Sequence, residues 1–244
     1  MRCDVVTEFK SDIYEICREV ADEFSGWEFS SGKFKNKKLK HTDLIVHVGF
    51  GFEGGATPVQ PSIQIINKRV SKLSKGIFGV DGCASMVSLQ TVAHTLKYTP
   101  EKLRTGFWVV QDKDEFLSLG QASQAVEDVT LDMIEARSAL IATMKDGISF
   151  IENHYDLGSE EDLLRGLPAK YTTRHVNSPY DQMEKMKGVM ICLVRILLGD
   201  FDFVWNYRND EFRTLFPKRF AELDNIIGVL PELRRKYDEN GSVI

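Results

Sequence analysis

The sequence predicts an α+β protein, with an N-terminal helix, a four- to five-stranded and mostly antiparallel sheet, and a helical C-terminal half packed on that sheet. Up to about residue 110, several short segments alternate apolar and polar residues, as strands with one buried face do. Beyond that point, apolar residues instead recur at steps of three and four, which is the helical period. Most of the strand segments follow one another without a helical pattern between them, which favours antiparallel pairing.

The first helix is predicted over residues 9–24. Its apolar residues recur at steps of three and four, so they share one face of a helix. Ser25-Gly26 follows them and is expected to end the helix. The residues of this face are Phe9, Ile13, Ile16, Val20 and Phe24.

The strands are predicted from alternation and from the short polar connections between them. Pro58 and Pro61 place the third segment at an edge of the sheet or at a strand start, because proline cannot donate a hydrogen bond to a neighbouring strand. The segments are Trp27–Phe34, Leu44–Phe52, Val59–Ile66, Met86–Ala93 and Phe107–Gln111.

A long amphipathic helix is predicted over residues 126–144 from apolar residues at helical spacing. Asp146-Gly147 is a plausible end for it, because glycine readily closes a helix. The apolar period continues through Ile148, Ile151 and Tyr155, so the alternative is a helix in which Gly147 is only a weak point.

Further helices are predicted in the acidic C-terminal half. Ser159 begins one, with acidic residues in its first turn, and Ser178-Pro179 begins another that Gly199 ends. Two more segments, near residues 210–216 and 217–229, lead to a polar tail. The second of these helices has an apolar stripe of Met183, Met186, Met190, Leu193 and Leu197, which is typical of core packing.

The domain organisation follows the change in charge. The 244 residues, 43% of them hydrophobic, are enough to bury a substantial core. Residues 1–110 carry 15 Lys and Arg against 12 Asp and Glu, a net charge of +3, whereas residues 111–244 carry 16 against 24, a net charge of −8. We expect residues 1–111 to form the helix and sheet and residues 112–244 to form the helical half, packed together as a single domain.

Several classes of protein are disfavoured. The start of the chain has no basic segment leading into an apolar run, and the most apolar run, Val189–Leu198, contains Arg195 and is too short to span a bilayer. We therefore expect a cytoplasmic protein without a membrane contact. Cys3, Cys17, Cys83 and Cys192 are scattered and form no C-x-x-C pair, which argues against a disulfide framework or a zinc knuckle.

One formal motif is present, the glycine pattern G-x-G-x-x-G over residues 49–54. A dinucleotide site needs a helix to open at this point, so that its N-terminal amides meet the phosphates. Pro58 and Pro61 lie where that helix would run and oppose it. The sequence therefore predicts no nucleotide and no other cofactor.

The histidines do not have the spacing of metal ligands. His47 shares its predicted strand face with Gly49, Gly51 and Glu53, and this polar patch is the best site for an enzyme of unrecognised class. A half-exposed histidine without a catalytic role fits the same pattern.

Two lysine clusters offer a different function. They could contact nucleic acid if they lay on one face with aromatic residues between them, although only Phe34 interrupts the first cluster. A solvated hairpin or a strand edge protected by lysines gives the same pattern, so nucleic acid is the less favoured partner. The clusters are Lys33, Lys35, Lys37, Lys38 and Lys40, and then Lys68, Arg69, Lys72 and Lys75.

The order of elements over about residues 5–200 resembles a family of small bacterial domains of unknown function found beside polymorphic toxins, similar to immunity proteins of contact-dependent growth inhibition. The pattern comprises the first helix, a Trp27-x-Phe29 strand, a lysine-rich turn, the Leu44–Phe52 strand, the Gly106–Val110 strand with Asp112-Lys113-Asp114, and a long helix ending in residues 147–152. The resemblance implies a cytosolic, acidic α+β protein that binds and blocks a cognate toxin.

An acidic inhibitor would associate quickly with a nuclease toxin, whose cleft is positive to hold phosphates. Two acidic groups are candidates for the contact, one after the last predicted strand and one at a later helix start. They are Asp112, Asp114 and Glu115, and Glu160, Glu161 and Asp162. The nucleic-acid module and the enzyme remain as alternatives, and the apolar period predicts no oligomeric state.

Overall fold

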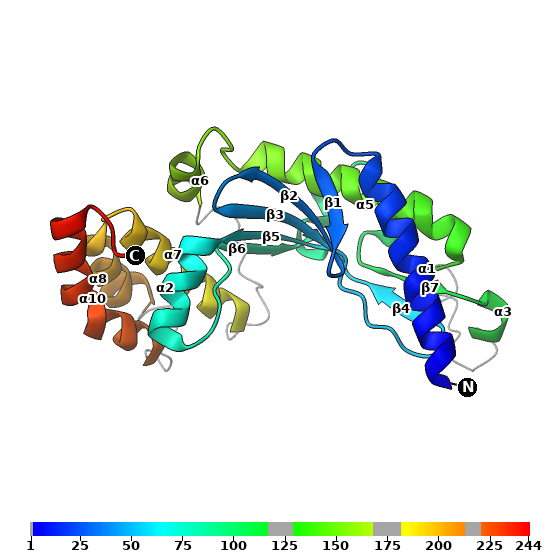
Figure 1. Ribbon diagram of the computed structural model, residues 1–244, viewed down its shortest axis with the longest axis horizontal. Helices are drawn as coiled ribbons and strands as arrows, with labels where there is room; N and C mark the ends of the chain where they lie inside the picture. Colours follow the sequence, from blue (N-terminus) through cyan, green and yellow to red (C-terminus); the bar gives the residue numbers. More distant parts are fainter. Residues whose placement is uncertain (1, 117–128, 168–181, 213–220) are drawn as a thin grey trace. The chain divides into compact units, whose positions relative to one another are not determined.

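The computed structural model describes residues 2–116, 129–167, 182–212 and 221–244 (Figure 1). It has an α+β fold with an N-terminal helix, a five-stranded antiparallel sheet, a small mixed sheet and a helical C-terminal half, which confirms the predicted fold class. The strands are β1 (Trp27–Ser30), β2 (Lys33–Leu39), β3 (Thr42–His47), β4 (Ala56–Val59), β5 (Ser62–Asn67), β6 (Ser85–Ser88), β7 (Phe107–Val110) and β8 (Thr130–Leu131). The helices are α1 (Arg2–Asp22), α2 (Lys68–Phe78), η1 (Leu89–Thr95), η2 (Glu101–Leu103), α3 (Lys113–Phe116), α5 (Met133–His154), α6 (Glu160–Gly166), α7 (Gln182–Leu197), α8 (Phe201–Asn206), η5 (Tyr207–Phe212) and α10 (Ala221–Asn240).

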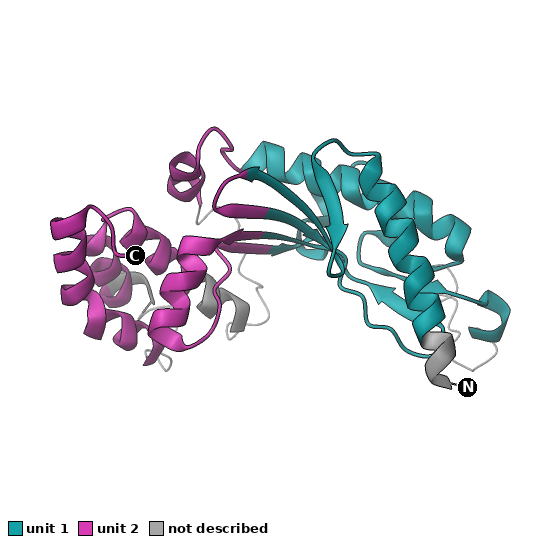
Figure 2. Cartoon of the chain, in the orientation of Figure 1, with its two compact units in different colours: residues 1–38, 44–64, 87–154 teal, residues 39–43, 65–86, 155–244 magenta. Residues whose placement is uncertain are grey.

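The chain divides into two compact units (Figure 2). Unit 1 contains residues 1–38, 44–64 and 87–154, and unit 2 contains residues 39–43, 65–86 and 155–244. The predicted assignment of residues 1–111 and 112–244 to two parts of one domain stays a prediction.

Helix α1 buries one face in the core of unit 1. Phe9, Ile13 and Val20 are at most 1% exposed, as the apolar period predicted, and so is Cys17, whereas the predicted Ile16 and Phe24 are only partly buried. The helix ends at Asp22, and the chain turns into β1 through Gly26, which adopts a left-handed φ of 79°. Glycine reaches this conformation without steric strain, so the predicted helix end is confirmed.

The predicted strand Trp27–Phe34 is instead a hairpin. Ser31 and Gly32 both have positive φ, the geometry of a tight two-residue turn between antiparallel strands. β1 then pairs with β2 so that Phe29 lies opposite Phe34. The lysine-rich segment is therefore a strand rather than a turn.

The five-stranded sheet has the order β1-β2-β3-β5-β6, and the smaller sheet has the order β4-β7-β8. β4 pairs with β7 in the antiparallel direction, and β8 pairs with β7 in the parallel direction. The predicted strand Val59–Ile66 is divided between the two sheets on either side of Gln60-Pro61.

The predicted strand Leu44–Phe52 ends early, at His47. Gly49 adopts a φ of 67° and approaches the Gln60 backbone so closely that a Cβ would lie 2.6 Å from the carbonyl oxygen. The chain therefore leaves regular strand geometry there. The predicted strand Met86–Ala93 is also too long, because β6 ends at Ser88 and η1 follows.

Helix α2 lies between β5 and β6 in the chain and was not predicted. The Asn67 side chain accepts hydrogen bonds from the backbone N–H groups of Arg69 and Val70 and so caps its start. Gly79 closes it with a φ of 74°.

Helix α5 differs from the prediction at both ends. Thr130-Leu131 is a strand, and the Asp132 side chain caps the helix that follows; residues 126–128 lie outside the described part. The helix then runs through Asp146-Gly147 to His154, which confirms the longer alternative. Gly147 is needed for packing, because a Cβ there would lie 2.7 Å from Val46 Cγ2 and 3.2 Å from Ile63 Cδ1.

The C-terminal helices belong to unit 2. Ser159 caps α6, and Met190, Leu193 and Leu197 are buried on α7, as predicted. The predicted start at Ser178-Pro179 and most of the segment 210–216 lie outside the described residues. The segment predicted over residues 217–229 is too short, since α10 continues through Pro231 to Asn240 and buries Leu230 and Leu233.

Candidate functional site

The first predicted contact group lies at the start of α3 in unit 1. Asp112, Asp114 and Glu115 are all exposed. Asp112 caps the short helix, since its Oδ1 accepts the Glu115 backbone N–H at 2.9 Å. Asp112 therefore has a local role in the fold, and the contact of the three acids with a partner stays a prediction.

The second predicted group lies at the start of α6 in unit 2. Glu160 accepts the His41 backbone N–H at 2.6 Å, and Glu161 pairs with Arg165 at 2.5 Å. Asp162 forms reciprocal bonds with Ser159, whose hydroxyl donates to the carboxylate and accepts the Asp162 backbone N–H. The structure thus brings together the members of each group. The carboxylates of Glu160, Glu161 and Asp162, however, each already have a partner within unit 2.

A larger acidic surface lies on the solvent side of α1, and sequence reasoning missed it. Five of its six carboxylates recur at steps of four, three, four and three along α1, so they share one side of the helix, away from the buried residues; the sixth follows directly after the helix ends. All six are exposed, and the five on the helix extend about 21 Å along it at 1.5 Å per residue. This surface, here called the α1 acidic face, consists of Glu8, Asp12, Glu15, Glu19, Asp22 and Glu23.

Two arginines neutralise part of the α1 acidic face. Arg18 pairs with Glu15, and Arg137 of α5 pairs with Glu19 at 3.5 Å and with Glu23 at 2.6 Å. The other three carboxylates, on Glu8, Asp12 and Asp22, form no ion pair with any residue that the structure describes. The face therefore keeps a net negative charge.

Partly exposed aromatic rings gather around Tyr14, on the side of α1 that carries Lys10 and Arg18. Tyr14 of α1 contacts Phe29 at 5.2 Å, Phe52 at 5.7 Å and Phe50 at 6.2 Å between ring centroids. The exposed Lys10 ammonium lies 5.4 Å from the Tyr14 ring centroid and 5.8 Å from that of Phe52. These four rings, here called the aromatic group, combine apolar area with faces that attract a cation.

The glycine motif contributes to the aromatic group. Phe50 and Phe52 stand at its variable positions, with ring centroids 5.3 Å apart. The chain continues from the motif into strand β4. The motif therefore presents aromatic side chains to α1, and no helix opens after it as a pyrophosphate site would require.

His47 was the predicted centre of an enzymatic patch. Its side chain is half-buried, and this burial, together with the positive charge of Lys33, lowers its pKa below the ordinary value. Glu53 is exposed and forms a backbone bridge with Ala56. Within the described residues, no hydrogen bond or ion pair joins His47 to Glu53.

The two lysine clusters lie mainly in different units. In β2, alternation places Lys33, Lys35 and Lys37 on the strand face opposite Phe34 and places Lys38 on the same face as Phe34. Lys37 pairs with Glu28 at 2.5 Å, which offsets one positive charge of the cluster. In α2, the lysines recur at steps of four and three and are exposed; they are Lys68, Lys72 and Lys75.

The cysteines behave as apolar core residues where their side chains are described. Cys17 and Cys192 are fully buried, and Cys83 is half-buried; none of the three forms a disulfide. Burial raises the pKa of Cys17 and raises that of Cys192 to about 12, so both stay protonated at neutral pH. Across the described ranges, no cluster of three or more His, Cys, Asp or Glu side chains is positioned to hold a metal ion.

None of the helices within the described ranges is long and apolar enough to cross a membrane. No protein-family model, no curated protein and no solved structure matches this chain. Its function is therefore inferred from its own residues.

Proposed function

We propose that this protein binds a positively charged protein through the α1 acidic face and thereby blocks it, as an immunity protein does with its toxin. The observation that carries the proposal is the row of five exposed carboxylates on one side of α1, followed directly by the exposed Glu23. Three of them have no ion-pair partner among the described residues. They remain available to a partner's lysines and arginines.

The buried side of α1 makes this row rigid. Phe9, Ile13, Cys17 and Val20 fix the helix in the core, so the carboxylates are held at helical spacing before any partner arrives. Neighbours three and four residues apart on a helix lie about 5–6 Å from each other. A pre-organised row of carboxylates loses little conformational entropy on binding. Its negative electrostatic field also raises the rate of association with a positively charged cleft.

The aromatic group supplies the second part of an interface. Protein interfaces combine a charged rim with a centre enriched in aromatic residues, which carry much of the binding energy. Tyr14 lies on α1 with Lys10 and Arg18 as its neighbours four residues away, so the partly exposed rings and the acids occupy different sides of the same helix. We expect the acids to attract the partner and the rings to hold it.

The test is co-expression with the product of the adjacent reading frame, followed by purification of the complex and a growth assay. The triple variant E8K/D12K/D22K reverses the three carboxylates without an ion pair. The matched control, E53K/E101K/E152K, changes three exposed acids of unit 1 that lie outside α1 and alters the net charge equally.

The wild type and the control are expected to co-purify with the partner and to protect the cells. The α1 variant is expected to lose both properties while keeping the circular dichroism spectrum of the wild type. The proposal is wrong if the wild type forms no complex, or if the α1 variant binds and protects as well as the control.

A further inference from the structure

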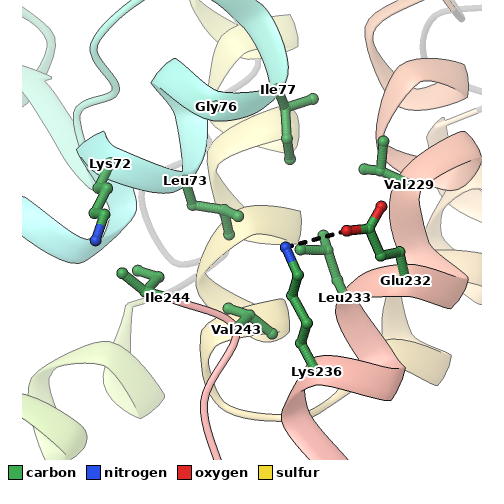
Figure 3. Close-up of a pocket in the computed structure, with 10 residues that line it drawn as sticks. All are labelled: Lys72, Leu73, Gly76, Ile77, Val229, Glu232, Leu233, Lys236, Val243 and Ile244. Atoms are coloured by element: carbon green, nitrogen blue, oxygen red, sulfur yellow. Dashed lines mark ion pairs between the residues drawn. The ribbon is translucent and has the colours of Figure 1, made fainter.

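Helix α2 of unit 2 carries a row of lysines on its solvent side. Lys68, Lys72 and Lys75 recur at steps of four and three, so they share one side of the helix, and all three are exposed. Figure 3 shows the Lys72 ammonium pointing away from the pocket between α2 and α10, into which Leu73 and Ile77 point. This set, here called the α2 lysine row, extends about 10 Å along the helix at 1.5 Å per residue.

The charge of the α2 lysine row is largely unbalanced. Helix α2 contains four basic residues and no acidic one. None of the three lysines of the row forms an ion pair with any residue in the described part of the chain. One carboxylate lies beside the row, since the Ser71 hydroxyl donates a hydrogen bond to Asp81 Oδ1 at 3.2 Å. The row therefore keeps a net positive charge.

The fold adds a cation from the other lysine cluster at the start of the row. The backbone N–H of Lys68 donates to the His41 carbonyl oxygen at 2.8 Å, so the turn that contains the exposed Lys40 adjoins α2. Glu160 accepts the His41 backbone N–H at 2.6 Å and brings one carboxylate to this turn. The two segments of unit 2 that form this surface, residues 39–43 and 65–86, carry five Lys and Arg against two Asp. The surface thus stays positive with Glu160 included.

The stability of α2 does not explain the cations at its start. Lys68 and Arg69 lie in the first turn, next to the positive end of the helix dipole, where acidic residues stabilise a helix and cations do not. The backbone N–H groups of residues 68–70 already have acceptors in His41 and Asn67. The two side chains therefore add to the positive potential at this end of the helix, which favours an anionic ligand.

We infer that the α2 lysine row, with Lys40 beside it, binds the phosphate backbone of a duplex nucleic acid. Such binding depends on charge and is independent of base sequence. Residues 68–75 include no aromatic residue, whereas a protein partner would be held by aromatic anchors and a single strand by rings on which its bases stack. A membrane would need an exposed apolar helix face, but Val70 and Leu73 of α2 are buried. The surface belongs to unit 2 and does not involve the α1 acidic face.

The probe is a short fluorescein-labelled DNA duplex, whose binding to the full-length protein is followed by fluorescence anisotropy at several salt concentrations. We expect a dissociation constant on the order of 10⁻⁴–10⁻⁶ M, without preference between duplex sequences. Three or four neutralised phosphates predict a slope of about −3 for the logarithm of the association constant against the logarithm of the salt concentration. Absence of saturable binding at low salt, or an affinity that does not depend on salt, would overturn the inference.

Other anions test whether the surface is built for a duplex. The same titration is made with single-stranded DNA, with phosphatidylserine vesicles and with polyglutamate. We expect each of them to bind more weakly than the duplex at equal salt. Tighter binding of any of the three would overturn the assignment to a duplex.

The variant K68Q/K72Q/K75Q removes the charges of the row. Glutamine forms helices about as well as lysine does, so α2 should persist. We expect the affinity at low salt to fall more than about tenfold and the salt slope to shrink to about −1. The matched control, K97Q/K102Q/K145Q, removes three exposed lysines of unit 1 and should keep both values. Equal effects of the two triple changes would refute the role of the row.

The single variant K68Q separates binding from helix stability. It removes a cation from the first turn of α2, so the melting temperature should stay the same or rise. The affinity for the duplex should nevertheless fall, and the salt slope should shrink by about one. A lower melting temperature with unchanged affinity would show that Lys68 serves the fold and not the ligand.

Discussion

The carboxylate of Asp146 is expected to be a main support of unit 1, and D146N tests this directly. Asp146 lies in the middle of α5 and is 3% exposed. Its Oδ1 accepts the backbone N–H of Lys97 at 2.7 Å and of Tyr98 at 3.1 Å. Its Oδ2 accepts those of Tyr98 at 3.2 Å and Thr99 at 2.7 Å. One side chain thus holds a whole loop on the helix.

The asparagine variant keeps the shape but replaces one acceptor oxygen by an amide donor. Whichever way the amide turns, its NH₂ group faces a backbone N–H that then lacks an acceptor. A hydrogen bond to a charged group contributes about 1.5–3 kcal/mol, and a buried unsatisfied group costs about 1–3 kcal/mol. These terms overlap, so we expect D146N to lower the free energy of unfolding by about 3 kcal/mol.

The assay is urea denaturation followed by circular dichroism, combined with amide hydrogen exchange. D146N should lose protection at Lys97, Tyr98 and Thr99 first, because one of these amides loses its acceptor and the loop that contains all three is then held less firmly. The matched control is E152Q, an exposed change on the same helix, which should stay within about 0.5 kcal/mol of the wild type. The reasoning is refuted if D146N is as stable as E152Q and the three amides stay protected.

Three further outcomes are expected. G147A should lower the free energy of unfolding by about 1–3 kcal/mol through its clash with Val46, and V46A should relieve part of that loss in a double-mutant cycle; strict additivity would contradict the contact. Burial and the positive charge of Lys33 lower the pKa of His47 in the folded protein. The contribution of His47 to the free energy of unfolding is therefore complete above the ordinary histidine pKa, and it is lost as the pH falls through the lowered pKa. The melting temperature of H47Q should therefore fall less than that of the wild type between pH 7 and pH 5, whereas parallel curves would contradict the shift. S159A should destabilise α6 by about 1 kcal/mol in urea denaturation, because it removes the cap, while S159T, which keeps the hydroxyl, should retain stability.

The sequence predicted those elements whose signals are local. The buried face of α1 follows from the spacing of Phe9, Ile13 and Val20, and the start of α6 follows from Ser159 and the acids after it. Both depend on residues within a few turns of each other. The turn at Ser31-Gly32 was also a local signal, but the lysines after it obscured the strand they belong to.

Tertiary contacts decided the elements that sequence reasoning placed wrongly. Asp146-Gly147 has the composition of a helix end, yet both residues lie inside α5 because of distant contacts. The backbone amides of residues 97–99 donate hydrogen bonds to the Asp146 carboxylate, and Val46 occupies the space that a side chain at Gly147 would fill. Helix α2 had capping signals at Asn67 and Gly79, but its lysines were interpreted only as a charge cluster.

Part of the candidate site could be predicted from the sequence. The carboxylates of the α1 acidic face recur with the same period as the apolar residues, so a search for charge periodicity would have found them. The aromatic group could not be predicted, because Tyr14 and Phe52 are far apart in the sequence and come into contact only in the folded protein. The same holds for the Lys40-His41 turn and the start of α2, which the fold brings together from distant parts of the chain.

The most direct test of the α1 acidic face is the association rate constant of the adjacent reading frame's product, measured by surface plasmon resonance at low and high salt. We expect a rate that falls at least tenfold as salt rises, and a low-salt rate at least tenfold slower for E8K/D12K/D22K than for E53K/E101K/E152K. Rates that are independent of salt and equal for the two triple variants would show that α1 does not guide the encounter.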